Sequence, residues 1–202
     1  MAEAPIPRSP LGAETAEPVV LASAGGVTIR ELPFAAQVDL RLEPEPALVD
    51  AVEGSLGVRL SVFPNRSTVG AGLRTIWLGP DEWLIVRPAG NPDALERRVA
   101  IAVGPLGGSV VEVSAVRTIL ELSGRAVRDL IARGCSLDLH PSAFPAGTCA
   151  QSLLAHVDVV FDCVESDRFH VFVRASFAPY LAAWLADALS LMIAAGDGAV
   201  SA

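Results

Sequence analysis

The chain has 202 residues and a mass of 21.0 kDa, enough for one domain or for two small lobes that share a core. Its 23 acidic side chains outnumber its 15 basic ones, so the net charge is −8 and a nucleic-acid partner is not expected. The mean hydropathy of +0.46 is high for a monomer and predicts apolar surface that another chain covers.

Residues 1–26 form a leader that contains Pro5, Pro7 and Pro10 and shows little apolar periodicity, so it is expected to be flexible. The leader has no basic segment followed by an apolar run, and no secretory signal is legible. Three cysteines, an odd number, do not suggest a disulfide framework and fit a reducing compartment. We therefore expect a cytoplasmic protein.

From Val27 onward, apolar and polar side chains alternate over 27–32 and 36–42, which predicts two half-buried strands. A helix is predicted over 46–56, because Pro46 suits a first helical turn and Gly57 suits a left-handed stop.

Polar residues that suit helix N-caps, Asn91, Ser123 and Ser176, mark the starts of three more helices. The remaining predicted elements, in chain order, are a β-hairpin over 73–86, a helix over 92–103, strand character over 109–122, a helix over 124–133 that Gly134 stops, strands over 149–161 and 168–173, and a helix over 177–194. Residues 195–202 are expected to be a disordered tail.

Two halves of the chain, about 27–108 and 109–194, show the same order of elements, β-α-β-β-α. The clearest match sets 77–87 over 161–174, where apolar runs flank an acidic turn, end in Arg and lead into a helix. The fold class is therefore predicted to be α+β, with duplicated β-α-β-β-α units, antiparallel or mixed sheets and helices on one face. Both halves belong to one domain over 27–194.

The last predicted helix has Asp187 as its only charge and lacks the polar face of a surface helix. A membrane span is not expected, because Pro179 and Asp187 interrupt the segment and no basic flank follows. Burial inside the chain and burial partly by a partner subunit both stay open, and the second also explains the high hydropathy. The residues predicted to face a partner are Tyr180, Leu181, Trp184, Leu185 and Leu189.

Cys135, His140 and Cys149 have the one spacing that suggests a metal or a nucleophile. A structural zinc site needs a fourth ligand and tight pairs, and a thiolate nucleophile needs a base beside it, whereas buried thiols are common. The role of these three residues stays open.

Arg117 and Arg174 are candidates for binding a carboxylate or an acidic partner, although a solvated or internally paired arginine is more common. Without a complete catalytic constellation, the residues favour an interaction subunit over a free-standing enzyme.

The stretch 134–151, with its Cys-Ser-Leu-Asp-Leu-His-Pro segment, and the segment 171–188 resemble the gamma subunit of heterotetrameric sarcosine oxidase. The hairpin at 77–84, Trp-Leu-Gly-Pro-Asp-Glu-Trp-Leu, is also similar to the wider folate-binding family of the glycine cleavage T-protein. The resemblance covers about residues 30–192. It implies two lobes like the folate-binding domain of the aminomethyltransferases, which agrees with the internal repeat.

The resemblance also implies a place in a complex that oxidises sarcosine to glycine with hydrogen peroxide, passing the methyl carbon to tetrahydrofolate or releasing formaldehyde. FAD, FMN, NAD and tetrahydrofolate are then expected on other subunits and zinc on the delta subunit. No catalytic, cofactor-binding or metal-ligating residue is expected on this chain. The implied partner is the alpha subunit and, through it, the beta and delta subunits, with no membrane contact.

Two alternatives stay open. The chain could be a stand-alone folate-binding protein of the aminomethyltransferase type, or it could be the same kind of subunit in a complex that oxidises N-methylglutamate or dimethylglycine. The sequence does not distinguish the N-methyl amino acid or the oligomeric state of the isolated chain.

Overall fold

The computed structural model of the chain describes residues 8–88, 90–104 and 107–199, so the first seven and last three residues of the expected leader and tail lie outside the described residues. The strands are β1 (Val19–Ala24), β2 (Val27–Leu32), β3 (Ala36–Arg41), β4 (Ser67–Gly70), β5 (Leu73–Gly79), β6 (Glu82–Arg87), β7 (Ser109–Glu112), β8 (Arg117–Ser123), β9 (Cys149–Leu154), β10 (Val157–Glu165) and β11 (Arg168–Arg174). The helices are α1 (Pro46–Leu56), α2 (Pro92–Val103), α3 (Val127–Ala132) and α4 (Ala178–Ala199), and a 3-10 turn, Ala175–Phe177, precedes α4.

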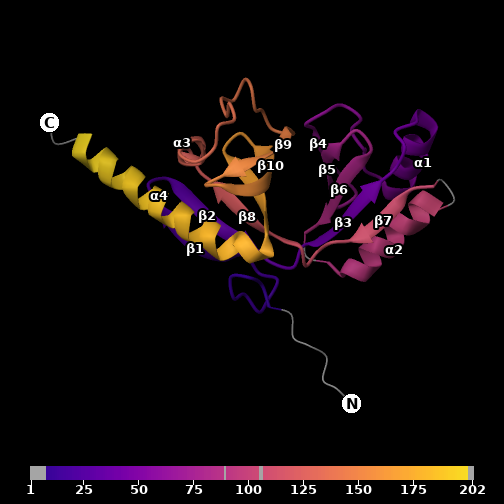
Figure 1. The fold of residues 1–202 in the computed structure, drawn as a ribbon, viewed down its shortest axis with the longest axis horizontal. Helices are drawn as coiled ribbons and strands as arrows, with labels where there is room; N and C mark the ends of the chain where they lie inside the picture. Colours follow the sequence, from indigo (N-terminus) through magenta and orange to yellow (C-terminus); the bar gives the residue numbers. More distant parts are fainter. Residues whose placement is uncertain (1–7, 89, 105–106, 200–202) are drawn as a thin grey trace, which may run out of the picture.

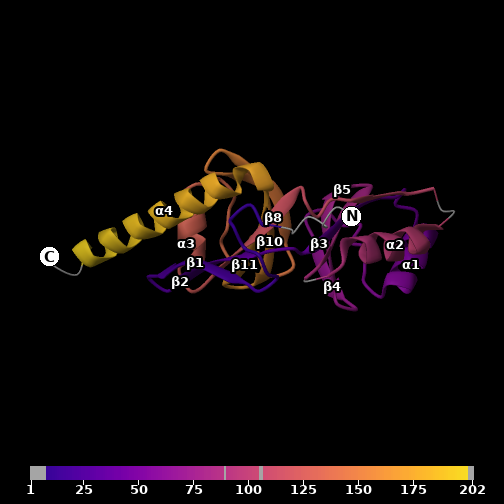
Figure 2. The same cartoon turned by 90° about the horizontal axis from the view of Figure 1, so that it is seen from below.

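The strands form two antiparallel sheets that lie side by side in two lobes (Figure 1). The six-stranded sheet has the order β1-β2-β8-β11-β10-β9, and the five-stranded sheet has the order β4-β5-β6-β3-β7. Helices α1 and α2 pack on the five-stranded sheet, and α3 and α4 pack on the six-stranded sheet, so the two lobes carry their helices at opposite ends of an elongated molecule (Figure 2). The predicted α+β class with antiparallel sheets is confirmed.

Three apolar clusters hold this arrangement together. One lies between the six-stranded sheet and its helices, and a second lies between the five-stranded sheet and its helices. The third lies between the two sheets and includes Ile76, Leu84, Ile119 and Phe172, all of which are at most 3% exposed. The central strands β6, β8, β10 and β11 are therefore buried over most of their length, whereas the edge strands β1 and β7 are largely exposed or half-buried.

The two sheets run through comparable strand orders, β4-β5-β6-β3 and β9-β10-β11-β8. In each sheet, the next strand after these four comes from the other half of the chain. The strand β7 pairs with β3, and the strand β2 pairs with β8. The boundary expected near residue 108 is therefore crossed by strand pairing in both directions. The duplication of a β-α-β-β-α unit itself stays a prediction.

Helices α1 and α2 agree with the predicted ranges, and Gly57 adopts the expected left-handed φ of 68°. The Asn91 side chain accepts a hydrogen bond from the Ala94 amide, as an N-cap does. Ser123 and Ser176 are not N-caps, because Ser123 ends β8 and Ser176 lies inside the 3-10 turn. Neither α3 nor the 3-10 turn has a side-chain hydrogen bond at its N-cap. These helices are positioned by packing instead.

The expected flexible leader is wrong for residues 19–24, which form β1 and pair with β2. Ser9 is also ordered against the fold, since its hydroxyl donates to the buried Glu31 at 2.9 Å. Glu31 in turn accepts from Thr118 of β8 at 2.8 Å. The expected tail is helical over 195–199, because α4 continues to Ala199.

The expected single strand over 149–161 is two strands, β9 and β10, joined at Ala155 and His156. Both residues have positive φ, 51° and 70°, as a tight hairpin turn requires. Asparagine and glycine usually mark this turn, so its two ordinary residues gave no sequence signal.

Candidate functional site between the two sheets

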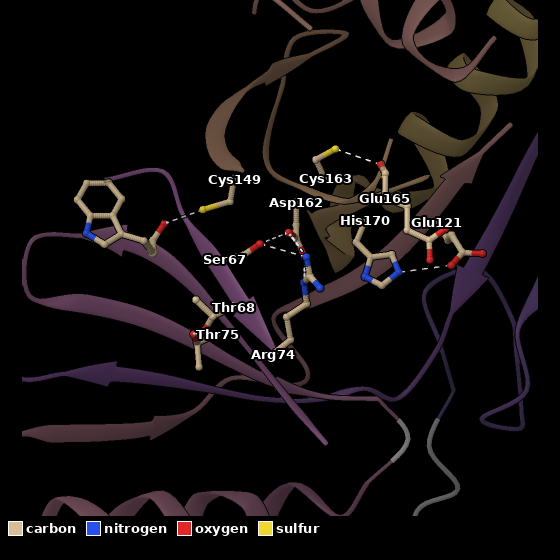
Figure 3. A network of polar contacts seen from close by, with 11 residues as sticks. Ser67, Thr68, Arg74, Thr75, Glu121, Cys149, Asp162, Cys163, Glu165 and His170 are labelled. Atoms are coloured by element: carbon tan, nitrogen blue, oxygen red, sulfur yellow. Dashed lines mark hydrogen bonds and ion pairs between the residues drawn. The ribbon is translucent and has the colours of Figure 1, made fainter. Parts of the chain in front are cut away.

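A buried ion pair joins the two sheets (Figure 3). Asp162 of β10 has no exposed surface, and its carboxylate pairs with Arg74 of β5, whose side chain is 12% exposed. Ser67 of β4 donates its hydroxyl to Asp162 Oδ1 at 2.6 Å, and Arg74 Nη2 donates to the same oxygen at 2.6 Å. Since removing both charges from water costs much of what their attraction returns, we infer that this pair fixes the relative position of the sheets more than it adds stability.

A row of ionisable side chains continues from Asp162 across the six-stranded sheet, through His170 of β11, Glu121 of β8 and Arg30 of β2. His170 Nε2 lies 3.4 Å from Glu121 Oε2, and Arg30 Nη1 lies 3.6 Å from Glu121 Oε1. The hydrogen bond with His170 lowers the pKa of Glu121 below its ordinary value of 4.5, although burial opposes this effect. The His170–Glu121 and Glu121–Arg30 contacts thus link three neighbouring strands, β11, β8 and β2, and Asp162 lies beside His170 on the fourth.

Arg117 and Arg174, which were named as candidates from the sequence without a prediction that they are neighbours, lie together in the structure. They are directly opposite each other on β8 and β11, and both line a cavity of about 520 Å³. The cavity wall also includes Gln151, Ser152 and Asp158 from β9 and β10. Unlike the buried ion pair of Arg74 and Asp162, these two arginines border a cavity that has room for a ligand.

Cys135, His140 and Cys149 do not form a site. Cys149 is buried and donates to the Trp77 carbonyl at 3.6 Å, and burial raises the pKa of its thiol to about 12. Cys135 lies 3.8 Å from the Ser152 hydroxyl, whereas His140 is exposed and bonds within its own loop, with Nδ1 2.7 Å from the Ser142 hydroxyl. In the described part of the chain, no group of three His, Cys, Asp or Glu side chains is placed to hold a metal ion.

The stretch 134–151 instead supports the β9–β10 turn. The Gly134 carbonyl accepts from the Ala155 amide at 3.1 Å, and the Ala155 carbonyl accepts from the Tyr180 hydroxyl at 3.0 Å. A side chain at Gly134 would meet the Trp184 ring at 2.5 Å, so glycine is needed for this close packing. The sequence assigned Gly134 to a helix stop, but the structure shows that room for Trp184 is the reason for it.

The predicted partner-facing set divides into two groups. Leu181 and Leu185 have no exposed surface and Leu189 is 2% exposed, because they pack on the chain's own sheet, so the prediction is wrong for these three. Trp184 is half-buried against Gly134, and Tyr180 is 49% exposed, so a partner contact stays a prediction for them. Segment 175–195 is apolar and long enough to cross a membrane, but a helix that covers a protein core satisfies the same test.

Sequence reasoning missed Arg74, Asp162 and Arg128. Asp162 gave a signal, because a carboxylate within the apolar run of β10 must find a partner, but the partner lies on the other sheet. Arg128 of α3 donates to the carbonyls of Phe144 and Ser166 and lies 4.9 Å above the Phe169 ring. It therefore fixes the stretch 134–151 to the lobe.

Comparison with known proteins places the chain in a family. Residues 38–191 match the model of the sarcosine oxidase gamma subunit family. The sarcosine oxidase subunit gamma of Corynebacterium sp. (strain P-1) is 36% identical over 172 residues, which is 83% of this chain and 82% of that protein. The subunit gamma of an Arthrobacter species is 34% identical over 83% of this chain and 82% of its own.

Solved structures agree. A chain of the heterotetrameric sarcosine oxidase from Corynebacterium sp. U-96 in complex with pyrrole 2-carboxylate matches with a TM-score of 0.80 and 32% identity, over 92% of this chain and 96% of that one. The glycine cleavage system aminomethyltransferase T from Bartonella henselae matches with a TM-score of 0.56 and 16% identity, over 77% of this chain and 44% of that one. The second likeness is one of fold alone.

Proposed function

Because the chain belongs to the sarcosine oxidase gamma subunit family, we propose that it is a structural subunit of a heterotetrameric sarcosine oxidase. The observation that carries the proposal is the match over nearly the whole length to a chain of such a complex, at a TM-score of 0.80. Sarcosine is then oxidised on the other subunits, which carry FAD, FMN, NAD, tetrahydrofolate and zinc. This chain packs on the large alpha subunit in the cytoplasm.

The polar groups between the sheets support an architectural role. The buried charges of Asp162 and Arg74 satisfy each other, and the Cys149 thiol is held neutral by burial, with no base in hydrogen-bond contact among the described residues. Such groups position two sheets but do not provide a nucleophile or an acid–base pair. A folate-binding function on this chain has no support beyond the shared fold with the aminomethyltransferase.

The start of α4 is the best candidate for the partner contact. Phe177, in the 3-10 turn that precedes α4, and Tyr180, in the first turn of α4, are 48% and 49% exposed. The Tyr180 hydroxyl bond to Ala155 holds its ring in place, so little side-chain freedom would be lost on binding. Aromatic side chains held in this way are frequent anchors of protein interfaces.

Co-expression tests the proposal. The tagged chain is produced with the flavin-bearing subunits of its complex, and the purified material is examined for the other subunits and for flavin absorbance. We expect co-purification in a stable complex. A chain that elutes alone and without flavin would contradict the structural-subunit role.

Substitution of the aromatic pair then tests the surface. Phe177→Ser with Tyr180→Ser is expected to reduce co-purification, while Ile101→Ser is the matched control, since Ile101 is 79% exposed on α2 in the other lobe. Equal recovery of both variants would show that α4 is not the contact, without affecting the proposed function.

A further inference from the structure

Two arginines share one end of the six-stranded sheet without an acidic partner. Arg117 and Arg174 are opposite each other in the β8–β11 ladder, an arrangement in which like charges repel. Within the described ranges, neither guanidinium lies within ion-pair distance of a carboxylate or donates a hydrogen bond to the protein. This differs from the other end of the same face, where Arg30 pairs with Glu121 and where Asp162 pairs with Arg74 of the facing sheet.

The local field adds to this repulsion. Burial and the neighbouring charge of Arg174 lower the pKa of Arg117, while Asp39 and Glu82 on the facing sheet act in the opposite direction. The pKa stays lowered chiefly because of burial, and a negative charge placed between the two guanidinium groups would favour the charged form of both.

The adjoining cavity has room for such a ligand. Its volume is about 520 Å³, within the range of small-molecule sites. Ser136 and Ser152 bring hydroxyl groups to its wall, and Leu153 and Phe172 bring apolar surface. Asp158 is the one acidic residue of the wall, and it disfavours a ligand with several negative charges.

We propose that this cavity is a carboxylate-binding site in which Arg117 and Arg174 hold a single carboxylate and the apolar wall contacts the rest of the ligand. A planar guanidinium matches a carboxylate through two parallel hydrogen bonds, and the single acid on the wall favours a monoanion over phosphate. Free organic acids and the acidic side chain of a neighbouring subunit share this chemistry. The possibility that a neighbouring subunit supplies the carboxylate rests on the proposed function.

The first experiment uses butyrate as the probe. The purified full-length chain, or the complex that contains it, is titrated in low-chloride buffer and followed by NMR or calorimetry, with sulfate at equal ionic strength as comparison. We expect saturable binding of butyrate that Arg174→Gln weakens by about tenfold or more, because one charge-assisted contact is lost. Arg97→Gln, an equal change of charge at an exposed position of α2, should leave binding unchanged.

The second experiment separates the two sources. If the carboxylate belongs to a partner subunit, Arg174→Gln lowers recovery of the complex while Arg97→Gln does not, and the wild-type complex no longer binds butyrate. Arg174→Gln should not lower the melting temperature of the isolated chain, because it removes a repulsion. The site is overturned if butyrate binds no better than sulfate and complex recovery is unchanged, or if Arg97→Gln has the same effect as Arg174→Gln.

Discussion

The ion pair between the sheets provides the sharpest test of how the two lobes are held. Arg74→Met would leave the Asp162 carboxylate, which has no exposed surface, with the Ser67 hydroxyl as its one side-chain donor in the described part of the chain. Removing one partner of a buried pair costs about 3–5 kcal/mol, because the other charge stays buried and uncompensated. For a chain of this length each kcal/mol lowers the melting temperature by about 2–4 °C, so we expect a decrease of about 6–20 °C.

Urea unfolding and calorimetry measure this loss, and two further variants control it. Arg168→Met removes a surface ion pair, since the side chains of Arg168 and Glu165 are 37% and 58% exposed. This change should lower the free energy of unfolding by at most about 1 kcal/mol. Arg74→Met combined with Asp162→Leu removes both buried charges and should recover most of the stability. The reasoning is refuted if Arg74→Met costs no more than Arg168→Met, or if the double variant is as unstable as the sum of its single changes.

Three further predictions follow from burial and from the pKa shifts. Iodoacetamide at pH 8 should modify the half-buried Cys135 and spare Cys149, whose pKa is raised to about 12, until the chain unfolds; equal rates in a mass-spectrometric time course would contradict this. The pKa of Glu121 is lowered, mainly by His170, so its contribution to stability is complete above pH 4.5 and is lost as the pH falls through the lowered pKa; Glu121→Gln should flatten the unfolding free energy measured in that range. Leu185→Ala should cost about 2–5 kcal/mol in urea unfolding, and a loss below about 1 kcal/mol would show that α4 does not cover the core.

The candidate site shows where prediction from sequence ends. Arg117 and Arg174 were both candidates from the sequence, but their adjacency depends on the β8–β11 register, which no local pattern encodes. The partner-facing residues on α4 were assigned from composition alone. Composition shows that a helix lacks charge, but it does not show which of its apolar side chains meet the chain's own sheet.

The sequence by itself determined the local elements of this protein. Proline, glycine and alternating apolar residues placed α1, α2 and the β5–β6 hairpin, because each signal acts within a few residues of the chain. Only the tertiary structure decided that β2 and β7 exchange between the halves, that Asp162 meets Arg74, and that the stretch 134–151 supports a turn. These contacts join segments far apart in the chain, so they are selected by the burial of whole faces and by the pairing of buried charges.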